Sequence, residues 1–308
     1  MKNTNEIQNN GLLWVNITQP EEKVLRAAQK RFQLADQDIK ESLPSFQRPK
    51  FIKRDEYYFM VLHFPVFDRK TRRLGFTEVD FFLSGQHFIT THNDSLPVIG
   101  SFFSECQKSN AARDRYFQGT AAKLFFELLS RLLDSIFPIL LHVNDDINAV
   151  DKILFAKIPD RKMAEEILRL KTNVVSFRRA MQSHKTVLER LITGGGRELD
   201  LQSCQSYINS TREHVNEIWH MLESQKESVD ALHQTSESVV GLHMNEIMRT
   251  LTVISVITFP LTLVATLFSI GAAGTPLVHD IFGFWKIAVL IAFGALLMFL
   301  VFKTKKWM

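Results

Sequence analysis

The two most apolar stretches of the chain lie near its C-terminal end. No ionisable residue occurs between Thr250 and Val278, and about 20 apolar residues are enough for a helix to cross a bilayer core. A second apolar run extends from Ile281 to Phe302 and contains one charged residue, Lys286, near its start. Its ammonium group can reach the headgroup region along its own alkyl stem. The pattern predicts two membrane-spanning helices joined by a short loop.

A stripe of mostly small polar residues runs along the first apolar stretch at alternating spacings of three and four, which places it on one helix face. Its members are Asn245, Met248, Thr252, Ser255, Phe259, Thr262, Thr266 and Ser269. Lipid offers polar groups no hydrogen-bond partner, so the stripe must face protein or water. Packing of Ser and Thr against another helix is the simpler interpretation. We favour a water-filled pore, because the stripe runs the length of the span.

Three large apolar side chains accompany this stripe. Met248, Leu251 and Phe259 are candidates for hydrophobic constrictions that gate a pore by dewetting. The alternative for all three is ordinary helix packing. With Leu251 included, the predicted pore-lining set is Asn245, Met248, Leu251, Thr252, Ser255, Phe259, Thr262 and Thr266.

The positive charges that flank the spans predict their orientation. Arg249 precedes the first span, whereas Lys303, Lys305 and Lys306 follow the second, and the connecting loop carries little charge. Because cytoplasmic flanks are enriched in Lys and Arg, both termini are expected in the cytoplasm. The first ten residues have no apolar core typical of a signal peptide. We therefore expect a multi-pass protein of the cell (inner) membrane with a large cytoplasmic front part.

Alternating apolar and polar residues predict an α/β domain at the front of the chain. Strand-like segments are Leu12–Ile17, Tyr57–Phe64, Glu78–Leu83 and His87–His92. Pro20 followed by two acidic residues marks the start of a helix. The tight turn between the last two strands favours a largely antiparallel or mixed sheet.

Helical periodicity dominates from about Arg113 onward. Gly194, Gly195 and Gly196 interrupt it, and we interpret them as a helix–helix turn, since the lysine and hydroxyl of a phosphate-binding loop are missing. A three-four spacing of apolar residues then continues from Leu201 to Val239 and predicts a long packed helix. No proline occurs between Gly196 and Pro260, so this helix should run into the first span, over on the order of 100 Å. A lever of this kind can couple a cytoplasmic event to pore width.

These patterns together predict an α+β cytoplasmic domain followed by a long stalk helix and two transmembrane helices. The predicted segments are 1–112 (α/β domain), 113–196 (helical region), 197–250 (stalk helix), 251–271 (first transmembrane, pore-lining helix), 272–283 (external loop), 284–303 (second transmembrane helix) and 304–308 (basic cytoplasmic tail).

Composition excludes several classes of function. The net charge of +4 is too small to indicate a nucleic-acid partner, and no basic patch is interleaved with aromatic residues. Cys106 and Cys204 lie far apart and fit buried thiols in a reducing compartment. No nucleophile–base pair or pair of catalytic carboxylates stands out, so we expect no enzymatic activity.

Two groups of residues are candidates for metal binding. His142, Asp145 and Asp146 are a possible cation sensor between subunits, although such residues more often lie on a solvated helix face. Asp80 could serve such a cytoplasmic sensor too, but its strand pattern equally allows ordinary exposure. His214, Glu217 and His220 lie within two turns of the stalk and could bind a transition metal. A His-x-x-Glu pair without a third fixed ligand is a weak metal signal, so solvated stalk residues are the better interpretation.

Several stretches of the chain resemble the CorA family of divalent-cation transporters. Gln47–Lys50 with the strand that follows resembles a motif of the cytoplasmic domain, and Asn245–Ser255 resembles the start of the pore helix. Phe259–Thr262 follows in register, and Lys305–Met308 resembles the basic, tryptophan-containing tail. The resemblance implies a funnel-shaped homopentamer in the lipid bilayer, with one pore formed by the first span of each subunit.

The sequence departs from the family at the outer mouth of the pore. The family signature there is Gly-Met-Asn, and alignment from Pro260 places Ser269, Ile270 and Gly271 at this filter position. Magnesium holds its water tightly, so it is recognised through its hydration shell, and the amide that would do so is missing. No resident cofactor is expected. The transported cation is expected to be magnesium, zinc, cobalt or nickel. Two alternatives are a zinc or broad transition-metal transporter of the same fold and a non-conducting membrane scaffold or sensor that retains the fold.

Overall fold

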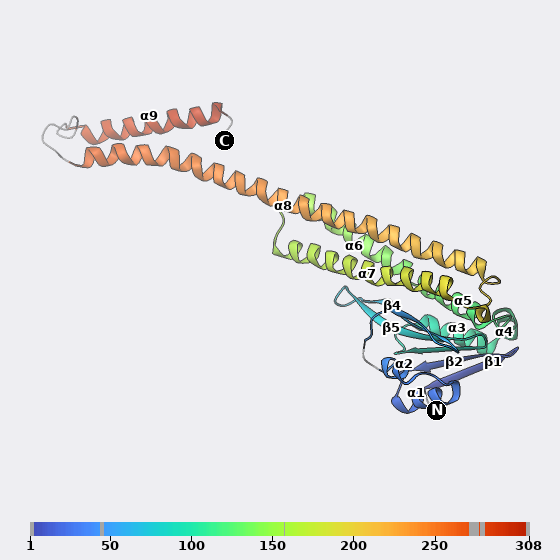
Figure 1. Cartoon of the computed structure of the whole chain (residues 1–308). Helices are drawn as coiled ribbons and strands as arrows, with labels where there is room; N and C mark the ends of the chain where they lie inside the picture. Colours follow the sequence, from blue (N-terminus) through green and yellow to red (C-terminus); the bar gives the residue numbers. More distant parts are fainter. Residues whose placement is uncertain (1–2, 44–45, 157, 271–276, 278–280, 306–308) are drawn as a thin grey trace. The chain divides into compact units, whose positions relative to one another are not determined.

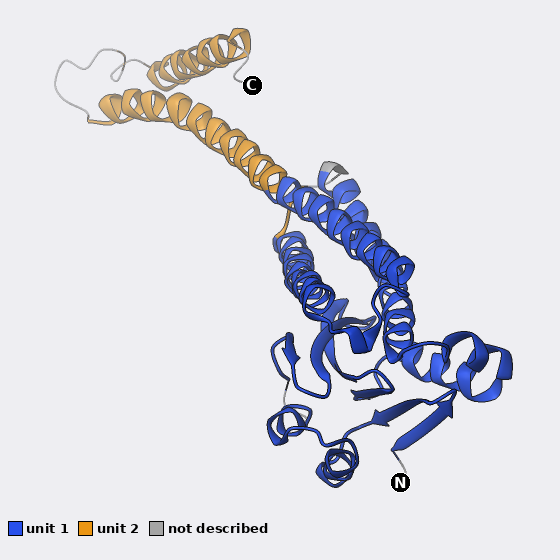
Figure 2. Cartoon of the chain, turned by 45° about the vertical axis from the view of Figure 1, so that its right-hand side comes forward, with its two compact units in different colours: residues 1–155, 161–233 blue, residues 156–160, 234–308 orange. Residues whose placement is uncertain are grey.

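A computed structural model describes residues 3–43, 46–156, 158–270, 277 and 281–305 of the chain. The chain divides into two compact units, shown in Figure 2. The first comprises residues 1–155 and 161–233, and the second comprises residues 156–160 and 234–308.

A six-stranded sheet forms the centre of the first unit. Its strands are β1 (Thr4–Asn9), β2 (Leu12–Thr18), β3 (Lys50–Lys53), β4 (Tyr58–Asp68), β5 (Arg73–Leu83) and β6 (His87–His92). Their order across the sheet is β1-β2-β6-β5-β4-β3. Only β2 and β6 pair in parallel, and the other neighbouring strands are antiparallel. The prediction of a mixed, largely antiparallel sheet is confirmed.

The two faces of the sheet are covered by different helices (Figure 1). Helices α1 (Glu22–Phe32) and α2 (Asp36–Glu41) pack on one face, against Val61, Phe82 and their neighbours. The other face is covered by α3 (Pro97–Lys108), α4 (Asn110–Tyr116) and α5 (Ala121–Asp134). Because side chains alternate along a strand, Phe81 and Phe82 enter opposite cores.

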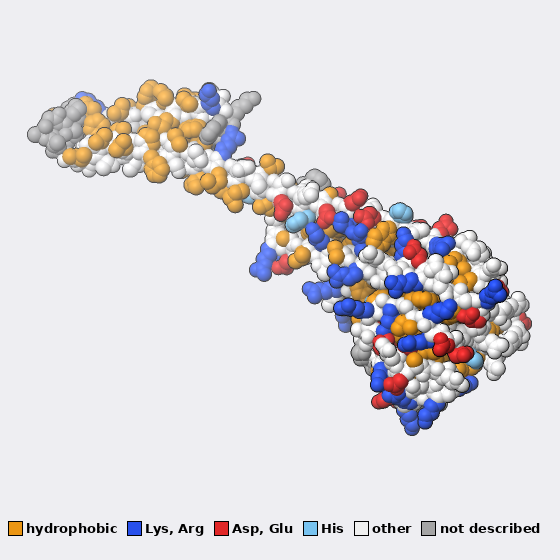
Figure 3. Space-filling model, in the orientation of Figure 1, with side chains coloured by type: hydrophobic (Ala, Val, Ile, Leu, Met, Phe, Trp, Pro, Cys, Tyr) orange, Lys and Arg blue, Asp and Glu red, His pale blue; other side chains and the backbone are white. Residues whose placement is uncertain are grey.

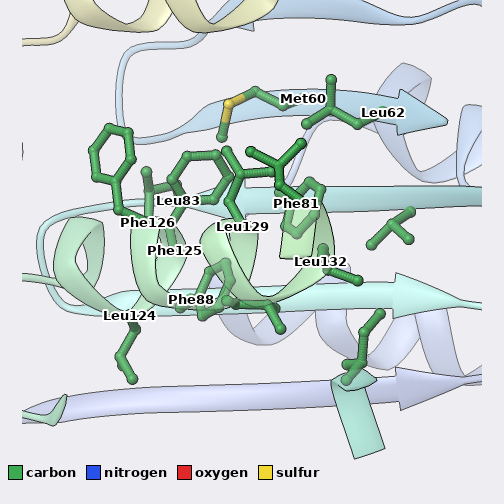
Figure 4. Packing of buried hydrophobic residues seen from close by; sticks show 14 of the residues in the cluster. Met60, Leu62, Phe81, Leu83, Phe88, Leu124, Phe125, Phe126, Leu129 and Leu132 are labelled. Atoms are coloured by element: carbon green, nitrogen blue, oxygen red, sulfur yellow. The ribbon is translucent and has the colours of Figure 1, made fainter. Parts of the chain in front are cut away.

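Aromatic side chains fill the larger of these cores (Figure 4). Phe125 of α5 meets Phe81 edge-on, with ring centroids 5.3 Å apart, and it meets Phe88 edge-on as well, with centroids 6.2 Å apart. All three side chains are fully buried or nearly so. Packed aromatic rings of this kind contribute both apolar area and favourable edge-to-face geometry, so they hold α5 against the sheet.

The periodicity predicted helices from about Arg113 onward. In the structure the first helix after the sheet, α3, already begins at Pro97. Farther along lie α6 (Phe137–Ala156), α7 (Arg161–Gly194) and a short 3₁₀ helix, η1 (Arg197–Leu199). The glycines after α7 form a helix–helix turn, as predicted. The Gly196 N–H donates to the Tyr58 hydroxyl at 2.7 Å, which fixes this turn to strand β4.

Helix α8 (Gln205–Ser269) is 65 residues long and contributes to both units. It continues through Pro260, although this residue has no N–H to donate to the preceding turn. Helix α9 (Gly283–Thr304) follows. Among the described residues, α8 and α9 are the two helices long and apolar enough to cross a membrane, and each contains an 18-residue segment of high mean hydropathy, 2.2 and 2.4 respectively.

Hydrophobic side chains cover the surface of the second unit in Figure 3, where charged side chains are few. Phe259 is 73% exposed and Val289 is 66% exposed. A soluble surface rarely carries so extensive an apolar patch, whereas lipid or partner helices would cover it.

Candidate functional site

The polar stripe of α8 lies on an exposed face of the second unit. Thr252, Thr262 and Thr266 are exposed in the single chain, and Met248, Leu251 and Phe259 are 54%, 55% and 73% exposed. The structure therefore places the predicted pore-lining residues on one accessible helix face. It contains one chain, so their contact with a lumen stays a prediction.

Helix α9 packs on the opposite side of α8. A Cβ atom added to Gly294 of α9 would lie 3.3 Å from Leu261 Cδ2, so the absence of a side chain there lets the two helices approach closely. Four apolar residues of the span that are less exposed share this face with Leu261; they are Val253, Ile257, Val264 and Phe268. At about 100° per residue these positions lie roughly half a turn from the stripe, of which Ser255 alone is half-buried. The face of α8 that meets α9 is therefore not the face of the stripe.

The hydroxyl groups of the stripe are oriented by their own helix. Thr252 donates to the Met248 carbonyl at 2.7 Å, Thr262 to the Thr258 carbonyl at 2.8 Å, and Thr266 to the Thr262 carbonyl at 2.6 Å. A hydroxyl has one proton and two lone pairs, so these bonds use the proton and leave only acceptor capacity. The acceptors that these three threonines leave suit the protons of water bound to a cation, or the cation itself.

The predicted outer mouth lies where α8 ends. Ser269 is the last helical residue, and Ile270, which is 66% exposed, follows it. Gly271 and Asp280 lie outside the described residues. The structure thus gives one hydroxyl side chain at this end of the stripe, and the effect of the altered triplet remains a prediction.

The three candidate sensor residues are not brought together. Asp80 lies on β5, whereas Asp145 and Asp146 lie on α6. Asp145 is exposed, and Asp146 forms ion pairs with Arg72 at 2.6 Å and Arg169 at 3.0 Å. Asp80 is only 3% exposed, so the interpretation of it as an ordinary exposed strand residue is wrong.

The histidines of the stalk form no metal centre in the part of the chain that the structure describes, where no group of three or more His, Cys, Asp or Glu residues converges. His214 Nδ1 instead lies 3.2 Å from the Asp134 carboxylate, and its ring packs edge-on against Phe137. Cys106 and Cys204 are both buried. Burial raises the pKa of the Cys106 thiol to about 12, as expected of an unreactive structural cysteine.

Comparison with known proteins matches residues 9–305 to the family model described as "CorA-like Mg2+ transporter protein". The chain belongs to this family. The cobalt/magnesium transport protein CorA of Thermotoga maritima is 24% identical over 301 residues, which cover 96% of this chain and 83% of that relative.

Solved structures of the same kind share the fold. The complete CorA magnesium transporter of Methanocaldococcus jannaschii superposes with a TM-score of 0.83 at 18% identity, over 98% of this chain and 93% of its own. The cytoplasmic domain of ZntB from Vibrio parahaemolyticus superposes with a TM-score of 0.60 at 12% identity, over 75% of this chain and 88% of its own. The predicted CorA-like fold is confirmed. The assignment to membrane transport rather than catalysis is also confirmed, because the CorA-like family consists of transporters.

The packing of α9 on α8 generates a first prediction. A chain with Leu261→Cys and Gly294→Cys should be joined internally by a short bifunctional thiol reagent, because these positions face each other in the CorA-like second unit. Peptide mass spectrometry after proteolysis measures the yield. Phe259→Cys with Gly294→Cys is the matched control, since Phe259 lies on the stripe. Equal internal yields for the two pairs would contradict the assignment of faces.

Proposed function

We propose that this CorA-like protein is a channel or transporter for divalent metal cations, with a pore formed by the first transmembrane helix of each subunit in a homopentamer. The observation that carries the proposal is the polar stripe of α8, which lies on the face turned away from α9 and in which Thr252, Thr262 and Thr266 keep only acceptor capacity. Polar groups in a bilayer need protein or water as partners. Five copies of α8 around an axis, the arrangement implied by the CorA resemblance, would give the stripe neighbouring protein and a water-filled lumen at once.

The proposed orientation places both termini in the cytoplasm and the protein in the inner membrane. Arg249 and the lysines that follow α9 support it through the charge bias of cytoplasmic flanks. An inside-negative potential then drives cation entry, by about 2.3 kcal/mol per charge for each 100 mV. A divalent cation experiences twice this driving force.

Within the pore, Met248, Leu251 and Phe259 are proposed as the constrictions. Each is more than half exposed in the single chain, so none is needed to fill a core there. Large apolar side chains that converge on an axis would exclude water from a narrow segment and close it to ions. Between them, Thr252 and Ser255 would offer polar surface once the segment is wet.

Cation selectivity is proposed to be broad. Two relatives of this chain are named as cobalt/magnesium transport proteins. The triplet at the mouth is Ser-Ile-Gly, so selection would depend on the hydroxyls inside the span. Hydroxyls discriminate poorly among cations of equal charge. A non-conducting scaffold or sensor that retains the fold is the competing class.

Reconstitution into liposomes tests the proposed transport. With an inside-negative potential, we expect uptake of Mg²⁺, Co²⁺, Ni²⁺ and Zn²⁺, read by an encapsulated fluorescent indicator. Thr262→Val with Thr266→Val should lower uptake at least tenfold, since the valines keep the shape and remove the acceptors. The aliphatic-face variant Val264→Ile serves as the control. Absence of uptake for every metal, while an intact Gly-Met-Asn relative conducts beside it, would favour the scaffold.

The altered triplet generates a separate prediction. Wild-type flux should be blocked poorly by cobalt hexaammine, an inert mimic of hydrated magnesium, because no amide ring captures it at the mouth. Replacement of Ser269, Ile270 and Gly271 by Gly, Met and Asn should increase this block at least tenfold and sharpen preference for Mg²⁺. Dose–response curves of flux measure both. Strong block of the wild type at equally low concentration would show that another group does the work of the asparagine.

A further inference from the structure

The segment Gln47–Lys50 borders two cavities of the first unit that the proposed pore does not use. It leads into β3 at the edge of the sheet, where β3 contacts α7. The first cavity has a volume of about 320 Å³ and the second a volume of about 350 Å³, and pockets of this size hold small molecules. Pro49, Arg179 and Ser183 line both cavities, so the two adjoin as one groove.

One face of α7 forms a long wall of this groove. Its lining residues follow each other at alternating spacings of three and four, as residues on one side of a helix do. They are Ser176, Arg179, Ser183, Thr186 and Arg190. From Arg169 to Lys185 the helix contains no acidic residue, and Figure 3 shows Lys and Arg side chains gathered along α7. The wall of the groove is therefore positively charged.

Acidic residues do not balance the charge of the groove. No Asp or Glu is among the residues that line either cavity. Lys50 is paired with Glu41, which lies outside the lining. The guanidinium groups of Arg48, Arg179 and Arg190 form no ion pair or hydrogen bond with the part of the chain that the structure describes. Three unpaired arginines around one hollow attract an anion.

Aromatic side chains gather in the second cavity. Phe46 is 63% exposed, and its ring stacks on the His63 imidazole with centroids 4.1 Å apart. His63 is held in turn, because its Nε2 lies 2.7 Å from the Gln47 carbonyl oxygen and 3.8 Å from Glu78. Phe76 lines the same cavity. An exposed ring supported from one side can receive another planar ring, and every nucleobase has a π face.

We propose that this groove binds a nucleoside polyphosphate. Its phosphates occupy the first cavity, where Arg179 and Arg190 present planar forks that bind two phosphate oxygens at once and Lys50 adds a point charge. Its base stacks on Phe46 in the second cavity, and Arg179 lies where the two cavities meet. The segment Gln47–Lys50 contributes to both cavities. The site lies within the first unit, so it does not depend on transport.

Calorimetric titration of the full-length chain in detergent with ATP tests the proposal. EDTA is present, so that no divalent cation bridges protein and nucleotide. Arg179→Gln should weaken ATP binding at least tenfold, and Arg190→Gln should weaken it several-fold. Lys185→Gln is the matched control, because it removes the same charge from α7 and lines neither cavity. All three side chains are exposed, so the variants should melt at the temperature of the unliganded wild type.

Phe46→Ala separates recognition of the base from recognition of the phosphates. It should weaken ATP binding several-fold and leave the binding of inorganic tripolyphosphate unchanged. Absence of saturable ATP binding, or equal ATP affinities of Arg179→Gln and Lys185→Gln, would overturn the proposal. Equal affinities of the wild type for ATP and tripolyphosphate, with no effect of Phe46→Ala, would overturn the assignment of a nucleotide, because a phosphate chain alone would then account for the binding.

Discussion

A polar group inside a bilayer must have a partner, and this constraint decides how the second unit works. Helix α8 carries the hydroxyls of Thr252, Thr262 and Thr266 on one face, and α9 packs on the other at Gly294 and Leu261. The hydroxyl protons are already used by carbonyls of the same helix, so the acceptors that remain must meet water, cations or another copy of the chain. In the proposed assembly a shared aqueous axis would satisfy them all, and the division of faces would thereby link an ordinary packing contact to transport.

The stripe and the two spans could be predicted from the sequence because they depend on local periodicity. A spacing of three and four fixes a helix face without knowledge of any neighbour. The continuation of α8 through Pro260 followed from the same pattern, since no other breaker precedes it. The side of α8 that meets α9 was not predictable with equal certainty. It depends on a close approach at Gly294, which no pattern within α8 records.

The sheet shows where sequence patterns are insufficient. Strand β1 was not predicted, because its only buried residue is Ile7 and no alternation is visible. The available signal was the hairpin turn at Asn10 and Gly11, both with positive φ. The strand pattern allowed ordinary exposure of Asp80 as readily as a role in cation sensing. Its burial is decided by α2 and by the strands on either side, which lie far away in sequence.

The central claim is that the stripe of α8 faces water in the assembled protein. Single cysteines placed from Leu251 to Ser269 and treated with a charged, membrane-impermeant thiol reagent test it directly, because Cys106 and Cys204 are buried. We predict fast modification at Thr252, Phe259, Thr262 and Thr266 and slow modification at Val253, Ile257 and Leu261. Uniform rates, or faster reaction on the Leu261 face, would contradict a pore lined by α8.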